Sequence, residues 1–196
     1  GPARLQIVSR QLAQYGQEYR PGADFYRPML LALVADLRLG TGTTHLDAAV
    51  ARARPTRAPH YDAVRRGLAD VVRTLGRRGV AIGPRPTRWQ WTDARARIKV
   101  TPDFLLEHRD GSLQAVKVHF KQSPLDRWTA AAGIRLMQYA GAAVESTVPV
   151  EPCLLDARRG KLWKPDGRTP VAGLDKLLAS EAAAYSALWT SLADAS

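Results

Sequence analysis

The chain has 196 residues, of which 45% are hydrophobic and 24% are charged. This length suits one domain with a full core, and the composition is that of an ordinary globular protein, not a disordered or fibrous one. Its single cysteine excludes an internal disulfide and a cysteine-based zinc site. The longest apolar run, residues 29–35, is far shorter than the roughly 20 residues that cross a bilayer, so we expect a cytoplasmic protein without a membrane partner.

Positive charge is concentrated in the body of the chain. The formal net charge is +11, and residues 171–196 contain Lys176 against Asp175, Glu181 and Asp194, which leaves +13 on the first 170 residues. A positive surface attracts polyanions without regard to sequence, and nucleic acid is the commonest polyanion of a cytosol. An arginine-rich composition is also typical of GC-rich genomes. We expect a nucleic-acid partner, with DNA favoured over RNA.

The opening Gly1-Pro2 resembles the remnant that a protease leaves after tag removal, so we expect one piece of a longer protein with further domains. The predicted organisation is an N-terminal helical extension, residues 1–59, packed on an α/β core, residues 60–196, within one compact domain. The sequence does not set the oligomeric state.

Helical periodicity dominates the first part of the chain. Residues 5–19 show weak helical spacing, and Asp24 is a candidate N-cap for a helix that Gly40 ends. Residues 40–59 predict a loop with one short helical piece, and their bases make this segment a candidate for a mobile, phosphate-facing loop. A clear amphipathic helix follows at residues 61–75.

From residue 80 the period of the apolar residues changes from 3.6 to 2. Residues 89–98, 99–107 and 113–121 predict an antiparallel meander, in which Asp110-Gly111 turns the last two strands. Ser123 and Pro124 begin a predicted helix that runs to about residue 143. Two strands follow, 150–157 and 161–164, and then a final helix, 171–192. This helix could pack on its own chain or on a second copy. Its expected buried stripe is Leu174, Leu177, Leu178, Ala182, Tyr185 and Leu188.

The order of helix, three antiparallel strands, helix and strand over residues 61–163 resembles the core of the PD-(D/E)xK nuclease superfamily, the restriction-endonuclease-like fold. The motifs that carry the resemblance are VTPDF at 100–104 and, after Gly111, AVKVHFK at 115–121. The resemblance implies a central mixed β-sheet flanked by helices. It also implies a nuclease of DNA repair, defence or mobile-element processing, in which Asp103 and an acid on the next strand bind Mg²⁺ or Mn²⁺ and a lysine orients the attacking water.

Alternation along two adjacent strands gives the candidate site residues. Asp103 and Glu107 share one face of their strand, while Lys117, His119 and Lys121 share one face of the next. If both faces look the same way, Asp103 lies near the three bases. The resemblance then makes Asp103 a candidate metal ligand and the three bases candidates for assisting the water, and Glu107 on the same strand is the candidate second ligand.

The sequence departs from the family pattern at the second acid. One alignment puts Lys117 in the place of the second carboxylate and His119 in the place of the lysine, whereas the other puts Ala115 at the acid and Lys117 at the lysine. An ammonium group beside Asp103 repels a divalent cation and pairs with the carboxylate instead.

Three sources could still complete a metal site. Glu107 could act from its own strand, an oxygen could come from Asp126 or Gln138 on the following helix, or His119 could ligate a softer metal.

A phosphate-binding strip without chemistry explains the same residues, and it requires no cofactor. The row Lys117, His119 and Lys121 is continued on the next helix by Arg127 and Arg135. Such a face binds phosphates through counterion release, although a basic strand face is also typical of a solvated edge.

The segment around Trp89 and Trp91 mixes aromatic and basic residues as stacking sites do, although such tryptophans are more often core. It adds four candidate nucleic-acid-binding residues: Arg88, Arg95, Arg97 and Lys99. The histidines at 45, 60 and 108 have no ligand spacing and are interpreted as surface residues. Two functions therefore stay open: an intact or degenerate nuclease, and a non-catalytic module that binds nucleic acid or a protein.

Overall fold

A computed structural model describes residues 6, 8–9, 25–76, 79–82, 89–93, 96–142 and 149–194 of the chain. From residue 25 onward, the described chain begins with three helices: α2 (Arg27–Leu39), α3 (Thr44–Ala51) and α4 (Ala58–Leu75). Five strands follow: β1 (Gly79–Ile82), β2 (Gln90–Asp93), β3 (Ala96–Lys99), β4 (Phe104–His108) and β5 (Leu113–His119). The remaining elements are α5 (Arg127–Ala142), β6 (Val150–Asp156), β7 (Lys161–Trp163) and α6 (Val171–Ala193).

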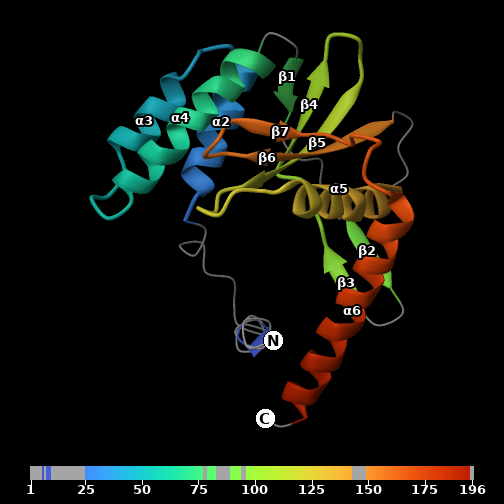
Figure 1. Cartoon of the computed structure of the whole chain (residues 1–196). Helices are drawn as coiled ribbons and strands as arrows, with labels where there is room; N and C mark the ends of the chain where they lie inside the picture. The colour runs from blue at the N-terminus through green and yellow to red at the C-terminus, as the bar shows by residue number, and fades with distance from the viewer. Residues whose placement is uncertain are drawn as a thin grey trace.

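Five of the strands form one mixed sheet in the order β1-β4-β5-β6-β7. The pairs β1–β4, β4–β5 and β6–β7 are antiparallel, and β5–β6 is parallel. Helices α2, α3 and α4 gather on one side of this sheet and α5 covers the other (Figure 1). The α/β class with a helix-flanked mixed sheet is therefore confirmed.

The sheet has an apolar layer on each face because neighbouring strand residues point to opposite sides. Phe104, Leu106 and Val116 pack with Leu33 of α2 and Leu68 of α4. The opposite face carries a second cluster, in which strand residues meet α5: Leu105, Ala115, Met137 and Ala140. The first cluster shows that α2 shares a core with the sheet. None of the helices in the described part of the chain has the length and apolar character to cross a membrane.

The turn between β4 and β5 fixes the pairing of these strands. Gly111 adopts a φ of 79°, which suits glycine in a tight turn, and the Asp110 carboxylate accepts the Ser112 N–H at 2.9 Å. The resulting register pairs Phe104 with Val116. The predicted Asp-Gly hairpin is confirmed.

The predicted meander is wrong in its first strand. Residues 90–99 form a separate two-stranded hairpin of β2 and β3, and the antiparallel neighbour of β4 is β1. Trp89 explains the difference, because its ring is buried against Gly141 of α5, where an added Cβ would lie 3.0 Å from the ring. The hairpin consequently lies on the side of α5 away from the main sheet (Figure 1).

Helices α5 and α6 differ from their predictions at specific positions. Helix α5 begins at Arg127, not at Ser123, because the Asp126 side chain accepts the Thr129 N–H at 2.7 Å and caps the first turn. Helix α6 has the predicted span, but only Leu174 and Ala182 of its expected stripe are buried. The helix extends away from the sheet, which explains its exposed surface (Figure 1).

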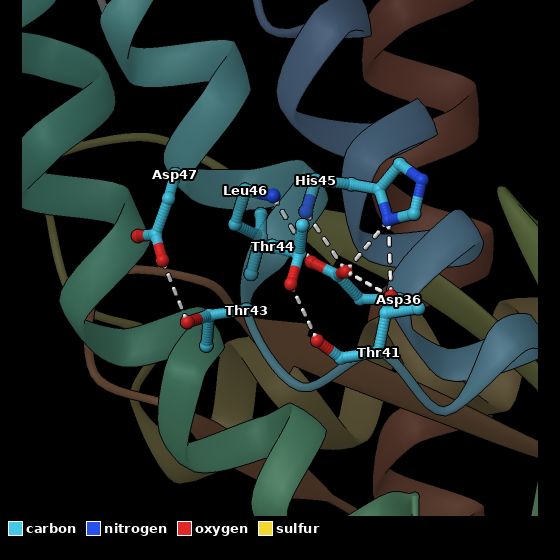
Figure 2. A network of polar contacts seen from close by, with 7 residues as sticks. All are labelled: Asp36, Thr41, Thr43, Thr44, His45, Leu46 and Asp47. Atoms are coloured by element: carbon cyan, nitrogen blue, oxygen red, sulfur yellow. Dashed lines mark hydrogen bonds and ion pairs between the residues drawn. The ribbon is translucent and has the colours of Figure 1, made fainter.

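A buried aspartate joins α2 to α3 (Figure 2). Asp36 is fully buried, and its Oδ1 accepts the Thr41 hydroxyl at 2.7 Å and the His45 N–H at 2.9 Å, while Oδ2 accepts the Leu46 N–H at 3.0 Å. The His45 Nδ1 also lies 2.8 Å from Oδ1. Burial raises the pKa of Asp36, but these hydrogen bonds outweigh it and lower the pKa below its usual value. The segment expected to be a mobile loop is therefore anchored, and His45 belongs to its anchor.

Candidate functional site

Asp103 lies at the point where β4 begins. Its N–H donates to the Val116 carbonyl at 2.8 Å, which extends the ladder by one residue and sets Asp103 opposite Lys117. Lys117 Nζ donates to Asp103 Oδ1 at 2.8 Å, and the Val118 N–H donates to Oδ2 at 2.7 Å. Both carboxylate oxygens therefore have a donor, and one donor is cationic. The expectation that adjacent strands bring Asp103 and Lys117 together is confirmed.

The other two bases of the row follow Lys117. His119 ends β5, and its Nε2 lies 2.8 Å from the Ser123 carbonyl oxygen. A carbonyl oxygen only accepts, so Nε2 carries the proton, and in the neutral ring Nδ1 keeps the lone pair. The Lys121 side chain is exposed just beyond the strand, and that of Lys117 is 41% exposed. The two lysines thus present ammonium donors to solvent, whereas the donor of His119 is already used on Ser123.

The candidate oxygen ligands are not brought to Asp103. Glu107 lies at the other end of β4, four residues away, which is roughly 13 Å at the rise of a strand. The Asp126 carboxylate accepts the N–H and the hydroxyl of Thr129, and these bonds lower its pKa. The Gln138 side-chain oxygen accepts from a guanidinium of its own helix at 3.2 Å. Glu107 is therefore too far from Asp103, and the oxygens of Asp126 and Gln138 already accept other hydrogen bonds.

Asp103, Lys117 and His119 form one wall of the sheet. Sequence reasoning missed a second carboxylate on this wall, that of Asp156. It ends β6 opposite His119, is 1% exposed, and accepts the Leu125 N–H at 3.2 Å and Arg159 Nη1 at 3.2 Å. Strand spacing and rise put its Cα roughly 12 Å from that of Asp103, too far to share one ion. The available signal was an aspartate at the carboxyl end of the strand that follows α5.

The donor set does not fit the Mg²⁺ or Mn²⁺ that the resemblance implies. These hard cations need at least two oxygen ligands free to coordinate. Both oxygens of Asp103 are hydrogen-bonded and an ammonium group lies beside them. In the residues that the structure describes, no group of three or more His, Cys, Asp or Glu is placed to hold a metal. The wall is suited to an anion instead.

The two arginines predicted to continue the row onto α5 have carboxylate partners. Arg135 donates from Nε and Nη2 to Asp175 of α6 at 2.7 and 3.1 Å, and its guanidinium lies 4.3 Å from the centre of the Tyr139 ring. These bonds to Asp175 raise the pKa of Arg135 further. Arg127 Nε donates to Asp166 at 3.1 Å. The structure therefore uses both arginines to hold α5 against the loop after β7 and against α6.

Two of the remaining candidates lie on the β2–β3 hairpin. Arg97 and Lys99 are exposed on β3. Arg88 and Arg95 lie outside the described residues. Trp89 is buried against α5, so its interpretation as a core residue is confirmed.

Comparison of the chain with known protein families and with curated proteins finds no match. Function is therefore inferred from the wall itself. Lysine ammonium groups beside an ion-paired aspartate can bind phosphate or carboxylate groups, and the described residues around Asp103 offer no pair of free carboxylates for metal-assisted hydrolysis.

Proposed function

We propose that this chain is a DNA-binding module with a PD-(D/E)xK-like fold, in which Lys117 stands in the place of the second metal-binding acid. The strand pairing supports the fold assignment. Helix α4 is followed by antiparallel β1, β4 and β5, then by α5, and then by β6 parallel to β5. This succession has the form that the resemblance implies, with β1 as its first strand.

The ion pair between Asp103 and Lys117 carries the functional proposal. A carboxylate that accepts an ammonium and a backbone N–H has its charge offset, so a divalent cation gains little by binding there. The ammonium has three N–H donors and uses one of them on Asp103, which leaves two for a phosphate oxygen. Lys117 lies on β5, and Lys121 is exposed in the bend two residues after the strand ends, so two ammonium groups are available to phosphates.

The overall charge supports the same function. A net charge of +11 attracts a polyanion from a distance, and short-range donors then hold the phosphates. We expect binding that depends strongly on salt and weakly on base sequence, in a DNA repair, defence or mobile-element system.

Fluorescence anisotropy with a labelled DNA duplex over a salt series tests the proposal. The double variant Lys117→Ala/Lys121→Ala removes two phosphate contacts, so the slope of log affinity against log salt should become shallower by about 1.8. The matched control is Arg66→Ala/Arg73→Ala, which removes two charges from exposed positions of α4. An equal change in both variants, or in neither, would contradict binding by the row.

A nuclease is the second candidate, because the aspartate of the Pro-Asp motif is retained beside the bases. Plasmid incubated with the protein and Mg²⁺ or Mn²⁺ separates the two functions. We expect no metal-dependent nicking. Nicking that Asp103→Ala abolishes would establish the nuclease instead.

A further inference from the structure

An open groove of about 1070 Å³ lies between α2, α3 and the loop that follows α3. Small apolar side chains form its floor: Ala32 and Ala35 come from α2, and Ala48 and Ala49 come from α3. Leu31 also lines the groove and is 57% exposed. Because alanine side chains are short, the space between the two helices is left for apolar groups from outside.

Positive charge lines one end of this groove. Arg52, Arg54 and Arg57 line it in the loop that follows α3. The side chains of Arg52 and Arg54 are exposed, and within the described part of the chain no carboxylate contacts either of them. The Arg57 guanidinium lies over the Phe25 ring at 4.9 Å from its centre. The loop thus offers guanidinium donors that the fold does not use on an acid.

The acids of α2 and α3 are already committed. Asp36 is the buried anchor shown in Figure 2, where the Thr41, His45 and Leu46 donors converge on it. Asp47 accepts Arg65 Nε at 2.5 Å and a threonine hydroxyl on its other oxygen. Neither carboxylate is available to the arginines of the groove, so their charge must be met by solvent ions or by a partner.

We infer that this groove binds a protein partner through a short peptide segment that combines acidic and apolar side chains. The lining residues of α2 run from Pro28 to Ala35, which is roughly 10 Å of helix, or about two helical turns of a partner. Apolar side chains of such a segment would cover the alanine floor, and its carboxylates would form paired hydrogen bonds with the guanidinium groups. This surface is separate from the wall of Asp103, and it does not depend on DNA binding there.

Nucleic acid fits the groove less well. Phosphates would use the arginines, but bases need aromatic faces or polar edges, and the floor is built of alanines. Two aromatic rings line the groove. Tyr61 is 2% exposed and donates its hydroxyl to the Phe25 carbonyl at 2.7 Å, so it has no free face for stacking. The His45 ring is tied to the Asp36 anchor, with Nδ1 2.8 Å from Oδ1.

The test uses labelled probe peptides of about ten residues, long enough to span the groove. The first has leucine on one helical face and glutamate elsewhere; the second replaces each glutamate by lysine, and the third replaces each leucine by serine. A labelled oligo-dT probes nucleic acid. We expect the leucine–glutamate peptide to bind the full chain at least tenfold more tightly than its two counterparts, a difference of about 1.4 kcal/mol.

Three variants locate the binding. Arg52→Glu/Arg54→Glu reverses the charge at the groove, and Arg66→Glu/Arg73→Glu makes the same charge change on the exposed side of α4. Ala48→Leu fills the floor without a change of charge. We expect at least tenfold weaker peptide binding from the first and third variants and less than a twofold change from the second.

The outcomes separate the alternatives. Equal weakening by both charge reversals, or equal binding of the glutamate and lysine peptides, would overturn the inference. It would also be overturned if Arg52→Glu/Arg54→Glu weakened only the binding of oligo-dT, because the groove would then bind nucleic acid. The exposed arginines can change without loss of the fold, which thermal unfolding checks for every variant. Peptide binding that persists in Lys117→Ala/Lys121→Ala supports a surface distinct from the DNA-binding wall.

Discussion

Replacing Lys117 by glutamate removes the ammonium that lies 2.8 Å from Asp103 Oδ1 and sets a second carboxylate opposite Asp103. Two effects should lower stability in the absence of a metal. The lost pair is partly exposed and contributes at most about 1 kcal/mol. Two like charges about 4 Å apart repel by about 1 kcal/mol in water and about 4 kcal/mol near a protein surface. We take about 3 kcal/mol in total, which lowers the Tm of a domain of this length by about 6–12 °C.

A divalent cation should reverse most of this loss, because the variant wall holds the two carboxylates that a hard cation requires. At a free concentration of 100 times its Kd, a bound ion adds about 2.7 kcal/mol to stability. The expected result is therefore a Tm that is low in EDTA and returns close to the wild-type value in Mn²⁺. The wild type should show little change between the two conditions.

Thermal unfolding followed by circular dichroism measures these shifts. Lys117→Gln removes the cation without adding an acid, and Asp103→Asn/Lys117→Glu keeps the new acid but removes its partner. Neither control should be stabilised by Mn²⁺. The reasoning would be refuted if Lys117→Glu gained no more from Mn²⁺ than Lys117→Gln, because the two side chains would then not share a site.

Three further predictions concern the fold. The lowered pKa of Asp36 means that its carboxylate stabilises the native state above the unfolded pKa of about 4, so the stability advantage of the wild type over Asp36→Asn should shrink as the pH falls below about 4, as measured by urea unfolding. Gly67→Ala should cost about 1–3 kcal/mol because the new Cβ would lie 2.2 Å from the Ala157 carbonyl oxygen; the control Gly173→Ala, whose Cβ meets no described atom within 4 Å, should raise stability by up to about 1 kcal/mol in chemical unfolding. Burial, followed by the charge of Glu151, raises the pKa of the Cys153 thiol to about 12, so iodoacetamide at about pH 8 should label this residue only after unfolding, which mass spectrometry detects.

Local chemistry made the centre of the candidate site predictable. The Asp110-Gly111 turn fixes the register of β4 and β5, and the alternation of side chains then sets Asp103 and Lys117 on one face. The two amphipathic helices α2 and α4 were predictable for the same kind of reason, since their apolar spacing is set within a few residues.

Interactions between distant segments were not predictable. The choice of β1 over residues 90–99 as the neighbour of β4 depends on where Trp89 packs, which is on a helix about 50 residues further along the chain. Arg135 was expected to face phosphate. Its actual partner, Asp175, lies 40 residues away in the sequence, so the ion pair could not be foreseen. The register that sets Asp156 opposite His119 likewise required the parallel pairing of β5 and β6.

The short helical piece predicted within residues 40–59 is α3, but the anchoring of this segment to α2 was missed for a different reason. Its organising residue, Asp36, interrupts the apolar pattern of a helix, and a fully buried aspartate is uncommon. The threonine- and glycine-rich segment that follows has the composition of a loop, and nothing within it reveals that Thr41, His45 and Leu46 donate to a carboxylate upstream.

The Asp36 anchor also has a consequence for recognition. Asp36 belongs to α2 on one side of the groove, and the His45 and Leu46 donors belong to α3 on the other, so the two helices separate only if both of these hydrogen bonds break. The two helices are thus already ordered in the free protein, so binding costs little further conformational entropy of the groove. A ligand entering here meets a preorganised receptor, whose selectivity resides in shape and fixed charge and not in adaptation.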